Sequence, residues 1–561
     1  MIEHTGPISG IAAYEDRYVI TAGYDNNVIL WDQRTKKSIC RTQHDHLVNQ
    51  VAFSPDGQFA VSSSSDYSAR VWQLPDMRLY SVLRGHDDDV EMSVFHPGGQ
   101  LIATASRDHN VRVFNLEGAC LATFLGHTAD VISVEWSPDG TQLISSSDDG
   151  TVKRWSLDSQ ALIKDIDLNG VETDTIAITK NGVIFAGNDE GKIVRVADDT
   201  TSIQAHDAGI KRVIIDPDKS LLVSLSYDRR MKIWDATDDR LTILATAELP
   251  DDVWPRSAAF AGHSKLVFAT FGSTYRTFDY GAQTWLAEDV PATGGANAVL
   301  ASKLHGIVTV GDSGTVKASG RELCDIGTLC NFLVETSGTI LTGGQLGILY
   351  DAATGRPILQ HRSPLNCGVT FERSGREHVL IGSYTGEGLV LDMCGDVPRH
   401  IETIHLSENA IKGVAHSAGT LFSVSADAAA AWFDAETLTQ RALLEGSHDK
   451  IANGCAGLDA GFFASVSRDL KLRIWDGQMQ ATVVPTPHDH SIKCVAASAD
   501  GRYIATGGYH GRIAVYDRRL DRWISDDRET SAGISSLAFD RENQEFLGSS
   551  YDGRVYRVPV A

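Results

Sequence analysis

The stretch that decides the fold runs from Arg41 to Gln73 and reads RTQHDHLVNQVAFSPDGQFAVSSSSDYSARVWQ. A second stretch at 123–156, TFLGHTADVISVEWSPDGTQLISSSDDGTVKRWS, follows the same pattern. Each contains a His, a Val four residues later, the turn Ser-Pro-Asp-Gly, an alternating segment, and an Asp followed six residues on by Trp. Self-similarity at a fixed spacing indicates a repeat architecture, so these stretches are predicted to be one structural unit occurring twice.

The Asp of this pattern, here named the Asp slot, marks the repeat along the whole chain. Successive slots lie about 41 residues apart, and the spacing is least regular between about 250 and 400. The predicted slots are Asp25, Asp66, Asp108, Asp149, Glu190, Asp228, Gly272, Ser313, Gly344, Thr385, Asp427, Asp469, His510 and Asp552. The sequence therefore predicts fourteen units.

Each unit is predicted to be four short strands joined by tight turns. Segments such as QFAVSSSS and SARVWQ are rich in small and β-branched residues and are bounded by Pro-Asp or Asp-Gly turn signals. Four-stranded units repeated radially form the blades of a β-propeller, which leaves no long sheet edge exposed. The predicted fold class is all-β.

The His near the start of a unit, the Ser-Pro-Asp-Gly turn and a closing Trp-Asp pair resemble the WD40 repeat, and the resemblance covers essentially the entire chain. The closing pair is kept at Trp31-Asp32, Trp234-Asp235 and Trp475-Asp476, and is softened at Phe114-Asn115, Tyr350-Asp351, Phe433-Asp434 and Tyr516-Asp517. WD40 propellers most often have seven blades. The resemblance therefore implies two seven-bladed WD40 propellers in tandem, with fourteen four-stranded blades.

The expected domains are an N-terminal propeller at 1–285 and a C-terminal propeller at 286–561. A split of eight plus six blades stays open, because the weakest repeats fall near the boundary. Few residues follow Val558 to supply an outer strand for the last blade. A closing strand is expected from Met1–His4 or from the crossing between the propellers.

Composition excludes several classes of protein. The 561 residues carry 50 Lys and Arg against 73 Asp and Glu, a formal net charge of −23, so nucleic acid is not an expected partner. Residues 1–15 lack the basic start and apolar stretch of a signal peptide, and no run of about 18 apolar residues is present. The eight cysteines include no Cys-x-x-Cys pair. We expect a cytoplasmic protein with no membrane segment and no cofactor.

Ser, His and Asp recur at equivalent positions, which invites comparison with a hydrolase triad. An enzyme needs one such site, whereas this set recurs five times. The sets are His4, Thr21, Asp25 and Trp31; His44, Ser62, Asp66 and Trp72; His127, Ser145, Asp149 and Trp155; His206, Ser224, Asp228 and Trp234; and His448, Ser465, Asp469 and Trp475. The WD40 resemblance implies a structural relay in which the Trp indole, the hydroxyl, the His and the Asp are joined by hydrogen bonds. The chain is therefore expected not to be an enzyme.

Two further features qualify this interpretation. The strings His44-Asp45-His46 and His488-Asp489-His490 leave a metal site as a minor alternative. His510 stands in an Asp slot, which puts the relay of that unit in doubt.

By the same resemblance, partners dock on the rim formed by the loops before the first strand and between the second and third strands. The residue before the slot lies on this rim, and it is Tyr or Arg at Tyr24, Arg107, Tyr227, Tyr384, Arg468, Tyr509 and Tyr551. Tyr and Arg dominate interface hot spots. Acidic residues accompany them at Asp87, Asp88, Asp89, Asp130 and Asp148. These predict a basic peptide or domain as partner, with turn-covering tyrosines and a solvated acidic face as alternatives.

The function expected from these features is a non-catalytic WD40 scaffold or adaptor that binds protein partners through its rim loops in a cytosolic complex. Two alternatives remain. One is a cytoskeletal regulator of the actin-interacting type, and the other is a small-ligand sensor or propeller enzyme that uses one central channel.

Overall fold

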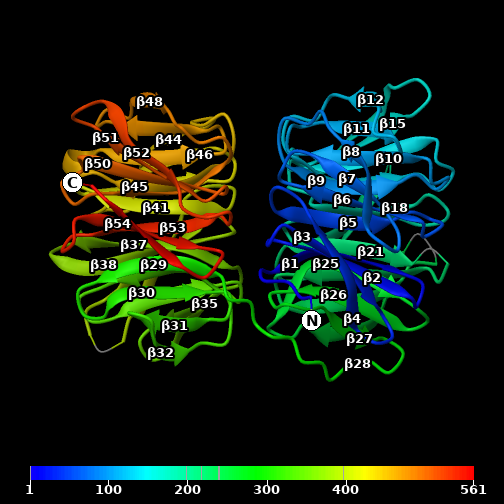
Figure 1. Cartoon of the computed structure of the whole chain (residues 1–561), viewed down its shortest axis with the longest axis horizontal. Helices are drawn as coiled ribbons and strands as arrows, with labels where there is room; N and C mark the ends of the chain where they lie inside the picture. The colour runs from blue at the N-terminus through cyan, green and yellow to red at the C-terminus, as the bar shows by residue number, and fades with distance from the viewer. Residues whose placement is uncertain (1, 198, 217, 238–239, 396, 561) are drawn as a thin grey trace. The chain divides into compact units, whose positions relative to one another are not determined.

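The computed structural model describes residues 2–197, 199–216, 218–237, 240–395 and 397–560. These residues form fourteen antiparallel sheets, thirteen with four strands and one with three (Figure 1). The one helical element among them is the 3-10 turn η1 (Asp459–Gly461). The chain divides into two compact units, Met1–Thr293 and Gly294–Ala561. The prediction of fourteen propeller blades in an all-β chain is confirmed.

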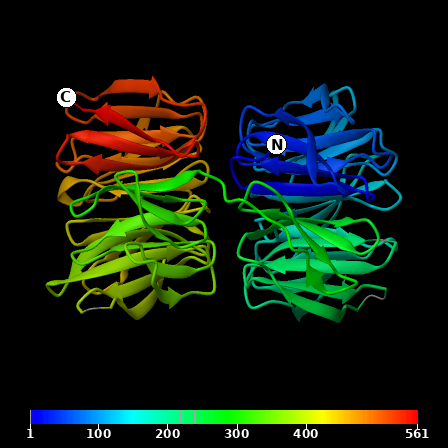
Figure 2. The same ribbon diagram turned by 60° about the horizontal axis from the view of Figure 1, so that its bottom comes forward.

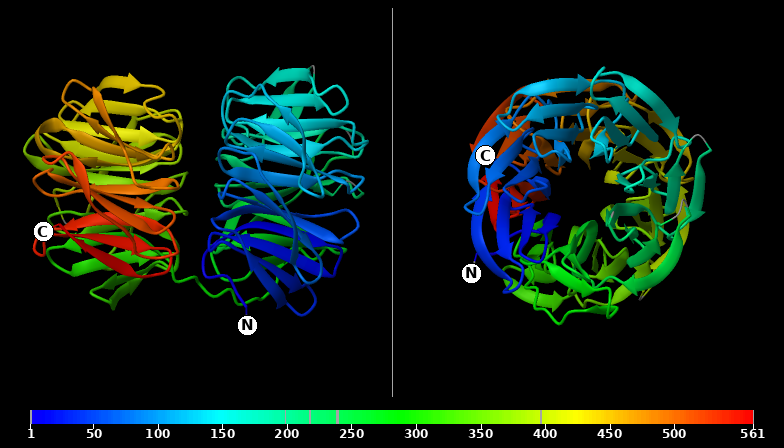
Figure 3. Two further views of the ribbon diagram at one scale, coloured as in Figure 1. Left: turned by 45° about the horizontal axis from the view of Figure 1, so that its top comes forward. Right: turned by 90° about the vertical axis from the view of Figure 1, so that its right-hand side faces the viewer.

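The first unit contains blades 1 to 7, which follow one another around a ring in the right-hand view of Figure 3. Their strands are β1 (Ile8–Tyr14), β2 (Tyr18–Gly23), β3 (Asn27–Asp32) and β4 (Lys37–Gln43); β5 (Val48–Phe53), β6 (Phe59–Ser64), β7 (Ala69–Gln73) and β8 (Arg78–Leu83); β9 (Val90–Phe95), β10 (Leu101–Ser106), β11 (Val111–Asn115) and β12 (Cys120–Phe124); β13 (Val131–Trp136), β14 (Gln142–Ser147), β15 (Thr151–Ser156) and β16 (Leu162–Asp167); β17 (Thr175–Ile178), β18 (Ile184–Gly187), β19 (Lys192–Val196) and β20 (Thr201–Gln204); β21 (Ile210–Asp216), β22 (Leu221–Ser226), β23 (Arg230–Asp235) and β24 (Thr242–Glu248); and β25 (Val253–Ala261), β26 (Lys265–Thr270), β27 (Arg276–Asp279) and β28 (Thr284–Trp285).

The second unit contains blades 8 to 14, coloured from green to red in Figure 2. Their strands are β29 (Ala296–Ser302), β30 (Gly306–Gly311), β31 (Thr315–Ala318) and β32 (Arg321–Asp325); β33 (Cys330–Glu335), β34 (Ile340–Gly344), β35 (Ile348–Asp351) and β36 (Pro357–Gln360); β37 (Leu365–Arg373), β38 (Arg376–Ser383), β39 (Glu387–Asp392) and β40 (Arg399–His405); β41 (Ile411–Ser417), β42 (Thr420–Ser425), β43 (Ala430–Asp434) and β44 (Gln440–Leu444); β45 (Ala452–Gly457), β46 (Phe463–Ser467), β47 (Lys471–Trp475) and β48 (Ala481–Pro485); β49 (Ile492–Ala497), β50 (Tyr503–Gly508), β51 (Arg512–Asp517) and β52 (Arg522–Arg528); and β53 (Ile534–Asp540), β54 (Glu545–Ser550) and β55 (Val555–Pro559).

Each blade is a meander in which consecutive strands pair antiparallel. The second and third strands are nearly continuous in buried residues, as in β2 and β3, because both faces of the sheet pack on neighbouring blades. The fourth strand alternates between exposed and half-buried residues, as in β4, because it lies on the outer circumference. The hydrophobic pattern therefore sets the position of each strand in its blade.

Apolar clusters lie between consecutive blades, and each joins two sheets. Between blades 7 and 1, for example, Ile8 and Trp31 pack with Val267 and Tyr275, with the Trp31 and Tyr275 rings 5.8 Å apart. Burial of such side chains is the main force that holds a propeller together. The blades are thus stabilised by their neighbours rather than by one central core.

Each unit closes its own ring by packing its first inner strand on its last one. In the first unit β1 contacts β25, and the Ile11 N–H donates to Ser257 Oγ at 3.1 Å. In the second unit β29 contacts β53, and Ser535 Oγ donates to the carbonyl of Ala296 at 2.5 Å. The rings therefore have seven blades each, and the eight-plus-six alternative is wrong.

The expected closing strand is also absent from the described part of the chain. Residues 2–4 form no strand, and the His4 N–H donates to Ser273 O in blade 7 at 3.1 Å. The fourteenth sheet has three strands, so the prediction of four strands in every blade is corrected for that blade. The boundary between the two units along the chain falls between Thr293 and Gly294, whereas the predicted boundary lay between 285 and 286.

The turn that carries the Asp slot has one backbone conformation in nearly every blade. In thirteen blades the residue after the slot has a positive φ, for example Asn26 at 67° and Gly150 at 74°. The same geometry places Gly347, with φ of 70°, after the slot of blade 9. That slot is therefore Leu346, and the predicted Gly344 is corrected because it is the last residue of β34.

Candidate functional site

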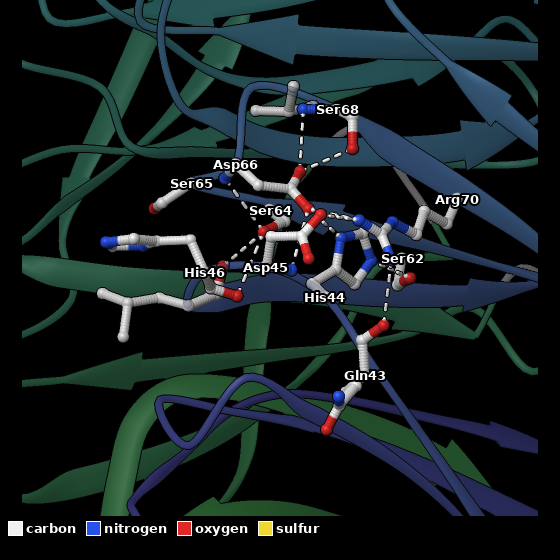
Figure 4. A network of polar contacts seen from close by, with 12 residues as sticks. Gln43, His44, Asp45, His46, Ser62, Ser64, Ser65, Asp66, Ser68 and Arg70 are labelled. Atoms are coloured by element: carbon white, nitrogen blue, oxygen red, sulfur yellow. Dashed lines mark hydrogen bonds and ion pairs between the residues drawn. The ribbon is translucent and has the colours of Figure 1, made fainter. Parts of the chain in front are cut away.

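The relay is complete in blade 2, where it joins the strands β6 and β7 to the loop before β5 and the turn between β6 and β7. Figure 4 shows its residues His44, Ser62 and Asp66. His44 Nε2 lies 2.7 Å from Ser62 Oγ, which also accepts a hydrogen bond from Trp72 Nε1 at 2.7 Å. On its other side, His44 Nδ1 lies 2.9 Å from Asp66. Each buried polar group has a partner, which avoids the cost of leaving it unpaired. Burial lowers the pKa of His44, which keeps the imidazole neutral.

The same connections recur in blades 1, 4 and 6. They join His4 to Thr21 and Asp25, His127 to Ser145 and Asp149, and His206 to Ser224 and Asp228, with Trp31, Trp155 and Trp234 donating to the three hydroxyls. The pKa of Asp25 falls to about 2, because the His4 charge and hydrogen bonds outweigh the opposing effect of burial. In each of these sets the hydroxyl and the imidazole form their hydrogen bonds with side chains of their own blade.

Three further blades depart from this arrangement. Blade 3 contains a relay that the sequence analysis missed, with His86 bonded to Thr104 and Asp108 and Phe114 in the Trp position. In blade 12 the guanidinium of Arg473 lies between His448 Nδ1 and Asp469, at 2.7 and 2.6 Å, so the direct His448–Asp469 distance is 3.6 Å. The relay of blade 3 could have been found in the sequence, because the spacing between its His and its Asp matches that of the other blades.

Blade 13 lacks a slot carboxylate, and its histidine is affected accordingly. His488 Nε2 keeps its contact to Thr506 at 2.9 Å, but the slot residue is His510. Burial lowers the pKa of His488 to about 4, and the neighbouring Arg512 adds to that effect. The doubt raised by His510 at the sequence level is therefore matched by an altered local relay.

One recurring backbone contact brings the predicted rim residues to the same face of each unit. The N–H of the residue before the slot donates to a carbonyl in the loop ahead of the first strand in thirteen blades. Examples are Tyr24 to Pro7, Arg107 to Asp89, Tyr384 to Pro364 and Tyr551 to Gly533. The rim residues of one unit are thus neighbours around its inner strands.

Arg107 is the centre of a charged group on the rim of the first unit. Its guanidinium pairs with Glu91 and Asp130, each at 2.5 Å, and Glu91 also pairs with Arg256 at 2.9 Å. The Arg107 side chain is 17% exposed, so this predicted hot spot is largely engaged within its own unit. Charge-assisted pairs of this kind are the stronger class of hydrogen bond.

Carboxylates crowd together beside that group. Burial and the nearby Glu172, Asp174 and Asp130 raise the pKa of Asp148 well above its usual range, against the opposing charge of Arg107. Lys211 lies 2.5 Å from both Asp174 and Asp189. We name Asp130, Asp148, Glu172, Asp174 and Asp189 the acidic rim. Its carboxylates outnumber the cations Arg107 and Lys211 that lie among them.

Two of the predicted acidic contacts are corrected. Asp88 and Asp89 are only 3% and 4% exposed, so they do not lie in an exposed loop as expected. The Asp89 N–H donates a hydrogen bond to Asp88 Oδ1 at 2.8 Å, so the Asp88 side chain folds back on the backbone of its own turn. A partner cannot reach these two side chains without a local rearrangement.

The predicted tyrosines pack on side chains of their own unit. Tyr24 meets Trp254 edge to face at 5.2 Å, and Lys211 lies 5.4 Å from the Tyr227 ring. In the second unit Lys412 lies 4.8 Å from the Tyr384 ring, and the Tyr509 and Tyr551 rings stack at 6.4 Å. Arg468 occupies the equivalent position in blade 12, with its N–H donating to Ile451 O. All of these rim side chains are half-buried.

Sequence reasoning missed a set of seven hydrogen bonds between consecutive blades. In most blades the first strand has a bulge at its second residue. Where this residue is Ser or Asn, its side chain donates to the first carbonyl of the next inner strand. We name these contacts blade latches. The donors and acceptors are Ser9 and Val48, Asn49 and Val90, Asn297 and Cys330, Asn331 and Leu365, Asn366 and Ile411, Asn453 and Ile492, and Ser535 and Ala296. A Ser or Asn directly after the first apolar residue of the strand was the available signal.

The two His-Asp-His strings do not form metal-binding clusters in the described ranges. No group of three or more His, Cys, Asp or Glu side chains there is arranged to hold a metal ion. His44 and His488 bond instead to Ser62 and Thr506. No helix in the same ranges has the length and apolar character needed to cross a membrane.

Comparison with known proteins finds the same repeat. The family model described as "WD domain, G-beta repeat" matches residues 1–32, 36–73, 77–115, 118–156, 198–235 and 480–517. Similar proteins include a periodic tryptophan protein 2 homolog of Dictyostelium discoideum, 26% identical over 38% of this chain and 20% of that protein. WD repeat-containing protein SL1-17 of Schistosoma mansoni is 26% identical over 40% of this chain and 64% of its own length.

A third relative, nuclear distribution protein PAC1 of Arthroderma benhamiae, is 31% identical over 48% of this chain and 46% of its own length. The chain thus spans less than two thirds of each of these relatives. The six matched segments lie on blades that share the slot turn, and each of them contains a His-hydroxyl contact of the relay type. Six of the fourteen blades thus match the family model, and the chain is a WD40-repeat protein.

Proposed function

We propose that this protein is a non-catalytic scaffold of a cytosolic complex and that the rim of its first unit holds a basic peptide or protein domain. Membership of the WD40-repeat proteins supports a protein-binding role in general. The rim residues that would meet the partner are Tyr24, Arg107, Asp130, Asp148 and Tyr227. In the second unit Tyr384, Arg468, Tyr509 and Tyr551 occupy the same positions and form a second proposed contact surface.

The observation that carries this proposal is the crowding of the acidic rim. Burial and three nearby carboxylates together hold the pKa of Asp148 high, and Lys211 is shared between Asp174 and Asp189. A Lys or Arg side chain of a partner would reduce the mutual repulsion of these groups. Attraction between opposite charges also accelerates association and falls with ionic strength.

The hydrogen bonds that the recurring Ser, His and Asp side chains already make with one another favour a non-catalytic role. In blade 2 the Ser62 hydroxyl is held between His44 and Trp72 and is fully buried. A nucleophile must reach its substrate. The buried hydroxyls of Thr21, Ser145, Ser224 and Ser465 are held between a His and a Trp in the same way.

The test is calorimetric titration of the full chain with a synthetic eight-residue peptide of alternating Lys and Ser. We expect binding that weakens steeply between about 50 and 300 mM salt, values chosen to span the range over which screening sets in. The double variant Asp148→Asn and Asp174→Asn should bind at least about tenfold more weakly, by loss of roughly 1.4 kcal/mol. The control is Asp158→Asn, an exposed carboxylate in the turn after β15. Equal binding by all three proteins would refute the rim assignment.

A further inference from the structure

The first unit has an open cavity between blades 4 and 5. Its volume is about 370 Å³, which is at the lower end of the range for small-molecule sites in proteins. Residues of the β13–β14 turn, of β14 and β15, and of the β17–β18 turn line it. Consecutive strands run antiparallel, so these turns lie at the opposite end of the blades from the slot turns of the rim. The cavity is therefore separate from the proposed rim site.

One lining residue replaces an apolar side chain that other blades bury. Strand pairing places Arg154 of β15 opposite Ile144 of β14. At this register position blades 1, 2, 3 and 6 have an apolar residue that is at most 5% exposed, namely Leu30, Val71, Val113 and Ile233. A guanidinium needs polar partners, which an apolar contact between blades does not offer. The packing of the blades alone therefore does not account for Arg154.

A second lining residue is smaller than its equivalents. Ile178 ends the inner strand β17, at the position where blades 2, 3 and 4 have Phe53, Phe95 and Trp136. These three aromatic residues share apolar clusters with Leu30, Val71 and Val113, respectively. The cluster between blades 4 and 5 includes Ile144, Ile178 and Ile184 but not Arg154. The cavity therefore lies where an aromatic ring and an apolar side chain pack together at three other interfaces.

Arg154 has hydrogen-bond donors that the described chain does not use. Its Nε and Nη2 donate to Gln142 Oε1 at 3.2 and 2.7 Å, and both N–H groups of Nη1 have no acceptor among the described residues. Blade 5 also has an Arg at this register position, and its Arg195 pairs with Asp199, four residues later, at 3.4 Å. Asp158 lies four residues after Arg154, but it is exposed and makes no such pair. The carboxylate that Arg195 has is therefore missing from Arg154.

The other charged groups of the lining already have partners. Lys180 pairs with Asp218 at 3.1 Å, and both side chains are well exposed. Asp139 accepts hydrogen bonds from Ser137 Oγ at 2.6 Å and from the Thr141 N–H at 3.0 Å, which hold it within its own turn. The charge that a ligand would meet is that of Arg154. A carboxylate matches it, because a carboxylate accepts two parallel hydrogen bonds from a guanidinium.

We propose that this cavity binds a small carboxylic acid that carries an aromatic or branched apolar group. The carboxylate accepts hydrogen bonds from Arg154, and the apolar group packs on Ile144, Ile178 and Ile184, where other interfaces have an aromatic side chain. The volume suits one ring and its acid group rather than an extended peptide. The proposal goes beyond the scaffold function and uses none of the rim residues, so either can fail without the other.

The probe is 3-phenylpropionate, which combines one ring with one carboxylate. Methyl NMR of the full chain, labelled at the isoleucine δ1-methyl groups, measures its binding. The signals of Ile178 and Ile184 should shift with a dissociation constant below about 1 mM, as for a small ligand of ordinary efficiency. The uncharged 3-phenylpropionamide should bind at least about tenfold more weakly, because it cannot form the charge-assisted pair.

Two variants separate the contact of the carboxylate from that of the apolar group. Arg154→Gln keeps a polar side chain without the charge and should weaken binding at least about tenfold. The matched control Arg41→Gln makes the same change on the exposed face of β4 and should alter binding by less than about twofold. Ile178→Phe places in the cavity the ring that blades 2 and 3 have at this position. It should abolish binding without lowering the melting temperature, since it fills a cavity.

The comparison of the acid with its amide uses the unmodified protein and so does not depend on the variants folding. Equal binding of acid and amide, equal binding by Arg154→Gln and Arg41→Gln, or no saturable shift up to about 10 mM would each overturn the proposal. The tripeptide Gly-Gly-Phe has the same ring and carboxylate at the end of a chain. Binding of this tripeptide more than about tenfold tighter than that of 3-phenylpropionate would assign the cavity to a protein C-terminus, and would also overturn the proposal.

Discussion

At the scale of single residues, the relay hydroxyl joins two buried side chains in each of blades 1, 2, 4, 6 and 12. Ser62 Oγ meets both the imidazole of His44 and the indole of Trp72, and all three side chains are at most 3% exposed. Removing it leaves two buried polar groups without that partner. The cost of such loss exceeds the net gain of an ordinary hydrogen bond.

Ser62→Ala is therefore expected to destabilise the first unit by about 3 kcal/mol, through two lost hydrogen bonds and the desolvated groups left behind. Urea unfolding followed by tryptophan fluorescence measures the change. The control is Ser202→Ala on the exposed strand β20, which should change stability by less than about 0.5 kcal/mol. A Ser62→Ala protein as stable as the control would show that the relay is not a stabilising element.

Histidine protonation gives the pH dependence of the second unit. The pKa of buried His488 is about 4 in the folded protein, below its ordinary value of 6.5. Between these values the unfolded chain binds the proton and the folded one does not, so stability is lost as pH falls below 6.5. From about pH 7 to about pH 5 this one group is expected to remove about 2 kcal/mol.

His488→Gln should abolish that loss. The difference in stability between the unmodified protein and the variant is expected to shrink by the same amount between about pH 7 and about pH 5. Urea midpoints at both pH values measure it, with the exposed His263→Asn as control. A difference that stays constant with pH would contradict the assignment to His488.

At this scale the sequence predicted the relay partners well, because each depends on spacing within one repeat. It placed Asp88 and Asp89 wrongly in an exposed loop, since their burial depends on how the turn folds back. The Arg473 side chain between His448 and Asp469 was also not predictable from the repeat. Side-chain positions set by how a turn folds or by an adjacent strand are not encoded in the spacing of the repeat.

At the scale of elements, the blade latches join consecutive inner strands where each strand begins. Asn453 Nδ2 donates to the Ile492 carbonyl at 2.7 Å, and Asn453 is 8% exposed. Other blades use Ser9 and Ser535 for the same contact, so a hydroxyl can replace the amide. A blade latch therefore requires a side chain that can donate a hydrogen bond, whether it is a hydroxyl or an amide.

Substitutions of Asn453 are expected to cost increasing stability in the order Asn453→Ser, Asn453→Ala and Asn453→Asp. The Ala substitution loses the hydrogen bond, at about 1 kcal/mol, whereas the Asp substitution places a carboxylate against a carbonyl oxygen and should cost about 3 kcal/mol. Thermal and urea unfolding at about pH 7, where an Asp carboxyl is ionised, measure the series. If Asn453→Asp were as stable as Asn453→Ser, the latch would not act through donation.

Turn positions were predicted correctly where the slot residue was Asp, because Asp-Gly and related turns give the strongest local signal. The slot of blade 9 was misplaced by two residues, since Leu346 gives no such signal and Gly344 does. The prediction of four strands in every blade failed for the last sheet, in which the described residues form three. A missing neighbour is a property of the assembled sheet and not of its sequence.

At the scale of the whole molecule, each ring closes within its own unit. The Ile11–Ser257 contact and the Trp31–Tyr275 packing close the first, and the Ser535–Ala296 latch closes the second. The closing contacts join residues that are far apart in sequence, so a ring becomes stable only when its last blade is present. This differs from an open repeat array, in which stability grows with each added repeat.

Residues 1–293 and 294–561, produced separately, are therefore each expected to fold into a monomeric ring with cooperative thermal unfolding. A shorter fragment, 1–252, ends before β25 and so lacks blade 7 and its contacts to β1. It should unfold without a cooperative transition or aggregate, because Ile8, Val19 and Trp31 lose the apolar surface that covers them. Far-UV circular dichroism and sedimentation compare the three. If 1–252 melted as sharply as 1–293, closure by blade 7 would not be what stabilises the first ring.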